Sequence, residues 1–422
     1  MRSFLCRALG AQPHELPALG WAFAYFFLLL SSYYILRPLR DEMAVQAGAS
    51  QLQWLFTATF VAMLALVPVF GWLCARFPRA RLLPAVYLFF ALNLVAFWAA
   101  VRLGLSARDL AAVFFVWLSV FNLFVVSVFW SFMADLFDDA QAARLYGAIA
   151  AGGSCGAIAG PALTALAVRD FGATNLLIVS AVLLIAAVGC IHELLAWARR
   201  HPRRGEARAE EPIGGSIAAG VRAALSSPYL LGICAYLLCY TTLSTTLYFQ
   251  QVEIVRAAVT DSDERTRLFA TIDLAVNSLT LVVQLLLTAR LGAALGVGWM
   301  LALMPIASLA GFAWLGVVPT LAVLIVFGVT RRVGEFAISK PVREALYTVV
   351  PREERYKAKN FIDTVIYRGG DAFSGWLIAA LRGLGLGVSG IAFAALPVAA
   401  GWIGVSFWLG RKQAKLRARM NP

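Results

Sequence analysis

Leu16 to Glu42 reads LPALGWAFAYFFLLLSSYYILRPLRDE, a long apolar run that ends in two arginines and two carboxylates. The run Leu16–Leu36 is long enough to be a membrane-spanning helix, since about 20 apolar residues cross the core of a bilayer. Arg37 and Arg40 then share one face of a continuing helix, and Arg37 can pair with Asp41. Charges at membrane depth are costly and usually face a water-filled cavity or a partner charge. The same residues could instead anchor the helix in the headgroup layer, so the segment alone leaves both interpretations open.

The composition places the chain in a membrane. It has 422 residues, of which 61% are hydrophobic and 14% charged, which is more apolar than a soluble domain needs to be. The apolar runs leave room for about a dozen spanning helices joined by short loops. They are too long and continuous for barrel strands, which alternate over about 10 residues. We therefore expect an all-α membrane protein, because helices satisfy their backbone hydrogen bonds within each span.

The predicted spans form two sets of six, separated by a charged segment. The first set lies near residues 17–40, 52–75, 82–102, 110–135, 145–168 and 173–197, and the second near 229–252, 266–289, 295–317, 319–340, 358–382 and 387–410. The predicted parts are an N-terminal half (1–197), a cytoplasmic linker (198–228) with an interfacial helix near Gly214–Leu225, and a C-terminal half (229–422) with a basic tail. Duplicated six-helix halves are a common transporter architecture. The sequence therefore predicts twelve transmembrane helices in two halves.

The net charge of +13 is concentrated in particular loops. Lysine and arginine gather in alternate loops and in the C-terminal tail, at Arg76–Arg81, Arg199–Arg208, Lys340–Lys359 and Arg411–Arg419. This positive-inside distribution predicts a multi-pass protein of a bacterial inner membrane with both termini in the cytoplasm. We expect the basic residues to face the lipid bilayer rather than nucleic acid, since no basic patch accompanies a folded domain.

The sequence carries no signature of catalysis or metal binding. The 6 cysteines form no Cys-x-x-Cys pair, and the 3 histidines are isolated from one another. No phosphate-binding loop or nucleophile motif is present. We expect no enzyme activity, no metal and no cofactor, so transport would be driven by gradients or by exchange.

The loop between the second and third spans has a recognisable pattern. It reads Gly71-Trp-Leu-Cys-Ala-Arg76-Phe-Pro-Arg79-Ala-Arg81. This pattern resembles the glycine-then-basic loop of the major facilitator superfamily. It departs from that loop at Ala75 and Pro78, where the family usually has Asp and Gly.

The fifth span carries a glycine repeat. Gly152, Gly156 and Gly160 recur every four residues, and Pro161 follows. Small residues at this spacing let two helices approach closely. The run also resembles a fifth-helix motif of exchangers in the major facilitator superfamily, although plain helix packing is sufficient to explain the glycines.

Ionisable residues inside the spans are the candidate functional residues, because a charge at membrane depth is costly. Guanidinium groups outnumber their obvious partners, and their planar fork suits phosphate and carboxylate, which predicts an anionic substrate. The predicted substrate contacts are Arg37, Arg40, Arg332, Arg368 and Asp371. The predicted coupling or gating residues, with protons as a candidate coupling ion, are Asp41, Asp135, Glu253, Asp273, Lys359 and Asp363.

Residue spacing predicts how some of these side chains are arranged. Lys359, Asp363 and Tyr367 recur every four residues and form a polar stripe that should face the bundle interior. Lys359 and Asp363 are a candidate entrance pair. Arg331 and Glu335, four apart, can form a purely structural pair or contact the substrate, and the sequence leaves both open.

Four motifs lie in order along both halves of the chain. They are Tyr34-Ile-Leu-Arg37-x-x-Arg40-Asp41-x-x-x-Val45, Phe129-Trp130-x-Phe132-x-x-Asp135 with Ala143-Arg144-Leu-Tyr146, Val252-Glu253-Ile-Val, and Pro341-Val-Arg343-Glu344-x-x-Tyr347 with Lys357-x-Lys359-x-x-Ile362-Asp363. Together they resemble the ATP:ADP antiporter family, the nucleotide transporters of plastids and intracellular bacteria. The last motif is the most specific. The resemblance implies a twelve-helix, major facilitator-like bundle.

The resemblance also implies residue roles. The family carries a functional Lys, two Glu and a second Lys, and the first three fall by motif on Arg40, Asp135 and Glu253, with the charge sign kept. The second Lys belongs to a Gly-Lys-Ser-Gly-Gly-like run, which here reads Gly370-Asp371-Ala-Phe-Ser374-Gly375. An acid thus stands where the family has a base, with Arg368 as a candidate replacement. This departure favours a less highly charged anion over ATP and ADP.

We therefore expect a secondary-active transporter that moves a nucleotide or another phosphorylated or carboxylated anion. The expected mechanism is alternating access around a central basic cavity, with exchange as the expected mode. One alternative is a proton-coupled symporter or exporter of an unrelated solute, whose transport would collapse with the proton gradient. A second is a lipid-handling or transport-inactive membrane protein, which would bind no soluble substrate.

Overall fold

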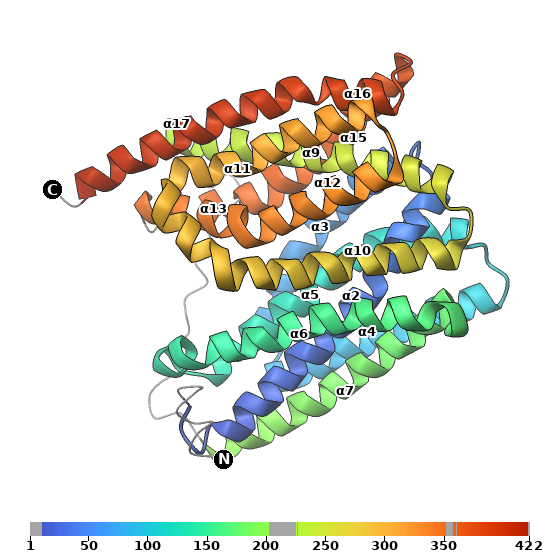
Figure 1. Cartoon of the computed structure of the whole chain (residues 1–422). Helices are drawn as coiled ribbons and strands as arrows, with labels where there is room; N and C mark the ends of the chain where they lie inside the picture. The colour runs from blue at the N-terminus through green and yellow to red at the C-terminus, as the bar shows by residue number, and fades with distance from the viewer. Residues whose placement is uncertain (1–10, 202–224, 226, 352–357, 360, 421–422) are drawn as a thin grey trace. The chain divides into compact units, whose positions relative to one another are not determined.

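The computed structural model describes residues 11–201, 225, 227–351, 358–359 and 361–420, and within these residues all regular elements are helical (Figure 1). The first group of helices is α2 (Leu16–Ala47), α3 (Leu52–Arg76), α4 (Arg79–Arg102), α5 (Ala107–Leu136), α6 (Asp139–Phe171) and α7 (Ala173–Arg200). The second group is α9 (Pro228–Ala258), α10 (Ser262–Val283), α11 (Ala289–Val317), α12 (Leu321–Gly334), α13 (Lys340–Leu346), α15 (Tyr367–Gly383), α16 (Val388–Ala394) and α17 (Leu396–Met420). The predicted all-α class is confirmed. Most of the predicted linker, with its interfacial helix near Gly214–Leu225, lies outside the described residues.

Ten helices in the described part of the chain are long and apolar enough to cross a membrane. The predicted spans near 319–340 and 358–382 are also helical, but π-helical segments interrupt them. In the first, α12 continues through η2 (Glu335–Ser339) into α13, and in the second, η4 (Ile362–Ile366) leads into α15. A third π segment, η1 (Gln284–Thr288), separates α10 from α11. Single π turns are rare and occur frequently at functional sites, so these segments direct attention to η2 and η4.

The first helix is longer than predicted. α2 continues through Pro38 and ends at Ala47 rather than near residue 40. The predicted end was placed where the charges begin, but Asp41 and Glu42 are buried and helical. All four charged residues of the opening segment therefore lie on one continuous helix.

The chain divides into two compact units, each described here on its own. Unit 1 comprises the described residues of 1–46, 65–208 and 259–277, and unit 2 those of 47–64, 209–258 and 278–422. Most of α2, α4 to α7 and the first part of α10 thus belong to unit 1. α9, α11 to α13 and α15 to α17 belong to unit 2.

Within unit 1, α2 packs against α4, α5 and α7 through buried side chains. The hydroxyls of Tyr25 and Tyr87 lie 2.5 Å apart, and Tyr87 donates onward to the backbone of α5 at 3.0 Å. The hydroxyls of Ser32 and Ser180 lie 2.6 Å apart. Polar groups away from water must be hydrogen-bonded, so these pairs fix how α2 is seated among its neighbours.

The glycine repeat of α6 lies against the backbone of α2. A Cβ atom on Gly152 would lie 2.5 Å from the carbonyl oxygen of Phe23, and one on Gly160 would lie 2.7 Å from that of Ser31. Gly156 comes equally close to the backbone at Phe27. The predicted close approach is confirmed, and its partner is the helix that carries Arg37 and Arg40.

Within unit 2, α9 packs against α15 and α17, and α11 packs along α17 (Figure 1). Hydroxyl groups join the helices: Tyr236 of α9 lies 3.0 Å from Ser339 of η2, and Ser374 of α15 donates to Thr242 of α9 at 3.0 Å. These contacts hold α9 between the two helices that contain π segments.

The start of α2 carries a pH-sensitive contact outside the span. Glu15 is buried and pairs with Arg144 at 3.0 Å, and it accepts hydrogen bonds from the Gln12 backbone and the Gln141 side chain. Burial raises the pKa of Glu15, but these partners outweigh it, so the pKa lies below its ordinary value of 4.5.

We expect the Glu15 contact to stabilise the protein above the ordinary carboxyl pKa and to lose this effect as the pH falls through the lowered value. Melting temperatures in detergent from pH 6 down to pH 3 should therefore fall less steeply for Glu15→Gln than for the wild type. Parallel curves for the two proteins would contradict this role.

Candidate functional site

The two arginines of α2 are held in different ways. Arg37 forms an ion pair with Asp273 of α10 at 3.5 Å, and the side chains are 16% and 2% exposed. Its guanidinium also lies 5.8 Å from the ring of Tyr34. The structure thus brings together a predicted substrate contact and a predicted coupling residue within unit 1.

Arg40 is paired with its sequence neighbour. It donates to Asp41 at 2.8 Å and lies 5.2 Å from the ring of Phe115 on α5. We predicted Asp41 as the partner of Arg37, four residues earlier. In the structure Asp41 forms an ion pair with Arg40, and Arg37 forms one with Asp273 of α10, a carboxylate that sequence spacing could not anticipate, while Asp41 still attracts Arg37.

A second contact between α2 and α10 was not predicted. Glu42 accepts two hydrogen bonds from Arg265 at 2.6 and 2.8 Å and one from Ser262 at 2.8 Å. The side chains of Arg265 and Glu42 are only 12% and 4% exposed. Bidentate pairs with little solvent contact are among the stronger charge interactions, so this pair fixes the end of α2 against α10.

Unit 2 contains a buried to half-buried group of tyrosines and charges that we call the tyrosine–arginine cluster. Its members come from α9, α12, η2, α13 and α15, and they are Tyr240, Arg331, Glu335, Arg343, Tyr367, Arg368 and Asp371. Tyr240 is the hub. Its ring lies 5.4 Å from the Arg331 guanidinium, 6.0 Å from that of Arg343 and 5.8 Å from the ring of Tyr367.

Glu335 pairs with Arg343 and not with Arg331. The Glu335–Arg343 distance is 3.1 Å, and the side chains are 6% and 9% exposed. The structural Arg331–Glu335 pair, one of the two possibilities that the spacing left open, is therefore not formed. The π turn η2 begins at Glu335 and adds about one residue to the helix turn. Arg343, eight residues after Glu335, therefore returns to the same face of the helix as Glu335.

Arg331 is consequently a buried cation that forms no ion pair with a carboxylate among the described residues, although Asp371 lies near enough to attract it. One of its nitrogens donates to Ser244 of α9 at 2.5 Å. Its Nε and Nη1 atoms are buried and have no hydrogen-bond partner in this part of the chain. Such donors are costly to bury, and they could be satisfied by an anion.

Arg368 and Asp371 form the other charged pair of the cluster. Their nearest charged atoms are 3.7 Å apart, and Thr245 donates to Asp371 at 3.2 Å. Arg368 also lies 5.5 Å from the ring of Tyr367. The acid that stands where the ATP:ADP antiporter family has a base thus offsets the arginine that could have replaced that base.

The remaining predicted residues lie elsewhere. Asp135 is exposed near the end of α5, and Arg332 is half-buried on α12. Glu253 forms an ion pair with Arg382 of α15. Lys359 donates to Glu344 at 2.5 Å. Asp363 is exposed, so the predicted polar stripe does not face the interior along its whole length.

The arrangement favours binding an anion over catalysis. The cluster has three guanidinium groups (Arg331, Arg343 and Arg368) and two carboxylates (Glu335 and Asp371), which leaves one excess positive charge. No group of three or more His, Cys, Asp or Glu side chains that could hold a metal ion was found in the described residues. Arg343 and Tyr240 are the cluster residues to which the sequence interpretation gave no role, whereas for Arg331 it left a structural pair and a substrate contact open.

Comparisons with known proteins agree on the fold. The model of the Major Facilitator Superfamily matches residues 21–370. No curated protein matches the chain. A bacterial homologue of the human lysosomal transporter Spinster has a TM-score of 0.59 at 14% identity, with 96% of each chain covered. An auto-inhibited POT family peptide transporter has a TM-score of 0.65 at 14% identity, covering 94% of this chain and 96% of that one. The nucleoside transporter NupG has a TM-score of 0.62 at 13% identity, covering 96% of this chain and 99% of that one.

Proposed function

We propose that this chain, which belongs to the Major Facilitator Superfamily, is a transporter for an organic anion. Its many long apolar helices make it a multi-pass membrane protein, and its structural neighbours are transporters of varied substrates. Those neighbours share 14% identity or less with it, so the substrate class has to be argued from this chain's own residues.

The observation that carries the proposal is the state of Arg331. It is 4% exposed, and two of its nitrogens lack hydrogen-bond partners among the described residues, while Glu335 and Asp371 form their ion pairs with Arg343 and Arg368. A phosphate or carboxylate group would satisfy both donors through the guanidinium fork. We assign Arg331 to substrate binding, together with Arg37, Arg40 and Arg368, whose roles rest on sequence.

The charge count favours a substrate with few charges. The tyrosine–arginine cluster supplies one excess positive charge, and the Arg368–Asp371 pair removes a counter-charge that a triphosphate would use. We propose a phosphorylated or carboxylated metabolite with one or two negative charges. This class of metabolite includes a nucleotide with one or two negative charges, which would be consistent with the resemblance to the ATP:ADP antiporter family.

The proposed mode is exchange by alternating access, since the sequence offers no nucleotide-hydrolysing motif. Proton coupling is the second candidate. Asp371 favours it, because its side chain is 13% exposed on α15 and lies between Arg368 and the Thr245 hydroxyl. If protons are coupled at Asp371, Asp371→Asn should make transport independent of the proton gradient. If they are not, the variant should exchange external for internal anion in the same ratio as the wild type.

Reconstitution into proteoliposomes tests the function. Uptake of labelled nucleotides, sugar phosphates and carboxylates would be measured into empty and preloaded vesicles, with and without a protonophore. We expect saturable uptake of one anion class, accelerated by internal anion and reduced about tenfold in Arg40→Ala, the change that loss of about 1.4 kcal/mol of binding produces. The exposed Arg290 provides the matched control, Arg290→Ala.

Two results would overturn the proposal. Unchanged transport by Arg40→Ala would show that Arg40 of α2 does not bind the anion. Translocation of fluorescent lipid with no uptake of any soluble anion would assign the chain to lipid handling instead.

A further inference from the structure

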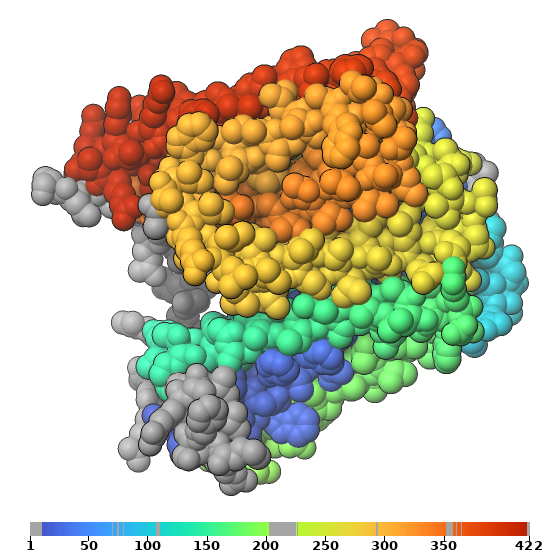
Figure 2. All heavy atoms as spheres, in the orientation of Figure 1, coloured from blue at the N-terminus to red at the C-terminus, as the bar shows by residue number. Residues whose placement is uncertain are grey.

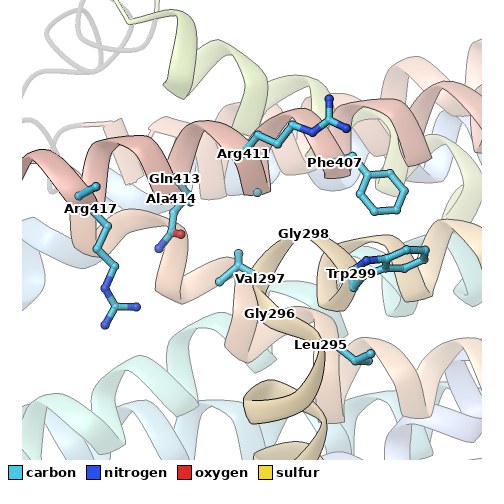
Figure 3. Close-up of a pocket in the computed structure, with 12 residues that line it drawn as sticks. Leu295, Gly296, Val297, Gly298, Trp299, Phe407, Arg411, Gln413, Ala414 and Arg417 are labelled. Carbon is cyan, nitrogen blue, oxygen red and sulfur yellow. The ribbon is translucent and has the colours of Figure 1, made fainter.

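A groove of about 970 Å³ lies between α11 and α17 in unit 2, away from the tyrosine–arginine cluster (Figure 3). On the α11 side it is lined by Leu295 to Trp299, and on the α17 side by residues between Phe407 and Ala418. Neither the predicted site residues nor the cluster contributes to it. The last turns of α17, which hold its basic residues, extend beyond α11 in Figure 2.

The floor of the groove is a break in α11. Gly296 has φ 70° and ψ 170°, so the helix stops and a new helical run starts at Val297 and continues to Val317. The first backbone N–H groups of a helix have no partner within it, and they attract anions, phosphate above all. A Cβ on Gly410 would lie 2.7 Å from the Gly298 nitrogen, so the two glycines hold this helix start close to α17.

The α17 side adds a buried polar group and two cations. Gln413 is 4% exposed, lines the groove and has no hydrogen-bond partner among the described residues. Figure 3 shows Gln413 directed from α17 toward Val297, with Arg411 and Arg417 on either side of it along the helix. Neither arginine has a carboxylate partner in the described part of the chain. The groove thus combines an amide donor, a helix start and the guanidinium of Arg417, which are groups that can bind a phosphate, while Arg411 lines its rim and extends along α17 away from Val297.

The surroundings favour a phosphate that is attached to a lipid. Trp299 is 54% exposed and Leu295 36%, and the Trp299 ring packs edge-on against Phe407 at 4.9 Å. Tryptophan and arginine at the end of an apolar span are typical of the membrane–water interface. We propose that this groove binds the headgroup phosphate of an anionic phospholipid, in the leaflet that the positive-inside rule makes cytoplasmic.

The test uses the full chain in a neutral detergent, where no membrane surface potential acts. Native mass spectrometry would count retained phosphatidylglycerol, with phosphatidylcholine as the zwitterionic comparison. The double variant Arg411→Gln with Arg417→Gln should bind phosphatidylglycerol at least about tenfold more weakly, since it removes both guanidinium groups that line the groove. The matched control is Lys412→Gln with Lys415→Gln, which removes the same charge from residues of α17 outside the groove and should retain binding.

A third variant tests whether lipid binding depends on the groove itself or only on the positive charge of α17. Gln413→Leu keeps every charge and should still weaken phosphatidylglycerol binding several-fold, without lowering the melting temperature of the lipid-free protein. Equal retention of phosphatidylcholine, equal loss in the lysine control, or equal stabilisation by inorganic phosphate would each overturn the lipid assignment.

Discussion

Arg331→Gln should lower the rate of anion uptake about 30-fold or more, since losing a buried charged hydrogen-bonding partner costs about 2 kcal/mol or more and about 1.4 kcal/mol is a factor of ten. The same variant should melt at or above the temperature of the wild type in the absence of substrate. The reason is that its guanidinium is buried with two unsatisfied nitrogens and no ion pair among the described residues, so removing it also removes a desolvation cost. Uptake in proteoliposomes and melting in detergent would be measured on the same preparations.

Two companion variants sharpen the result. Arg331→Lys keeps the charge but not the planar fork, so we expect a smaller loss, expressed mainly as a higher KM. Arg290→Gln makes the same chemical change at an exposed position of unit 2 and should leave uptake unchanged. A lower melting temperature with normal uptake in Arg331→Gln would mean that Arg331 serves only to pack against Tyr240.

The spans were predictable because hydropathy is a local property. Every predicted span overlaps helical segments in the described part of the chain, since a run of apolar residues must form a helix to satisfy its backbone in lipid. The end of α2 was misplaced for a related reason. Charged residues resemble a helix terminus in sequence, but Asp41 and Glu42 find partners that keep them buried and helical.

The charge pairs were not predictable, because they depend on other helices and on helix geometry. Arg37 finds Asp273, which lies far along the chain, in place of the nearer Asp41. Glu335 pairs with Arg343 because the π turn that begins at Glu335 changes which of the following residues share its face, whereas spacing alone suggested the nearer Arg331. Spacing rules assume a regular α-helix, and nothing in this sequence announces where an extra residue enters a turn.

The glycine repeat was also predictable only in part. Close approach by Gly152, Gly156 and Gly160 followed from their spacing, whereas the identity of the neighbour as α2 required the fold. That neighbour links the repeat to function. α2 carries Arg37 and Arg40, so the packing of α6 sets the position of both candidate anion contacts within unit 1.

Gly156→Ala should therefore lower the melting temperature by several degrees and reduce transport along with it. Its Cβ would collide with the carbonyl oxygen of Phe27 and lie 3.0 Å from the Ser31 nitrogen, and backbone cannot move aside as a flexible side chain can. Overpacking of this kind costs about 1–3 kcal/mol. Either α2 shifts, which displaces its arginines, or the unit loses stability.

Gly147→Ala provides the control, because it makes the same change on the same helix. No atom lies within 4 Å of the Cβ that it would add. Alanine is the better helix former by about 1 kcal/mol, so this variant should match or exceed the wild-type melting temperature and transport normally. If both variants melted alike, α6 would tolerate a wider spacing from α2, and the repeat would not hold the arginines in place. A loss confined to Gly156→Ala would instead mean that the distance between these two helix backbones is a requirement for transport, and that an anion site on α2 depends on residues of α6 that never touch the anion.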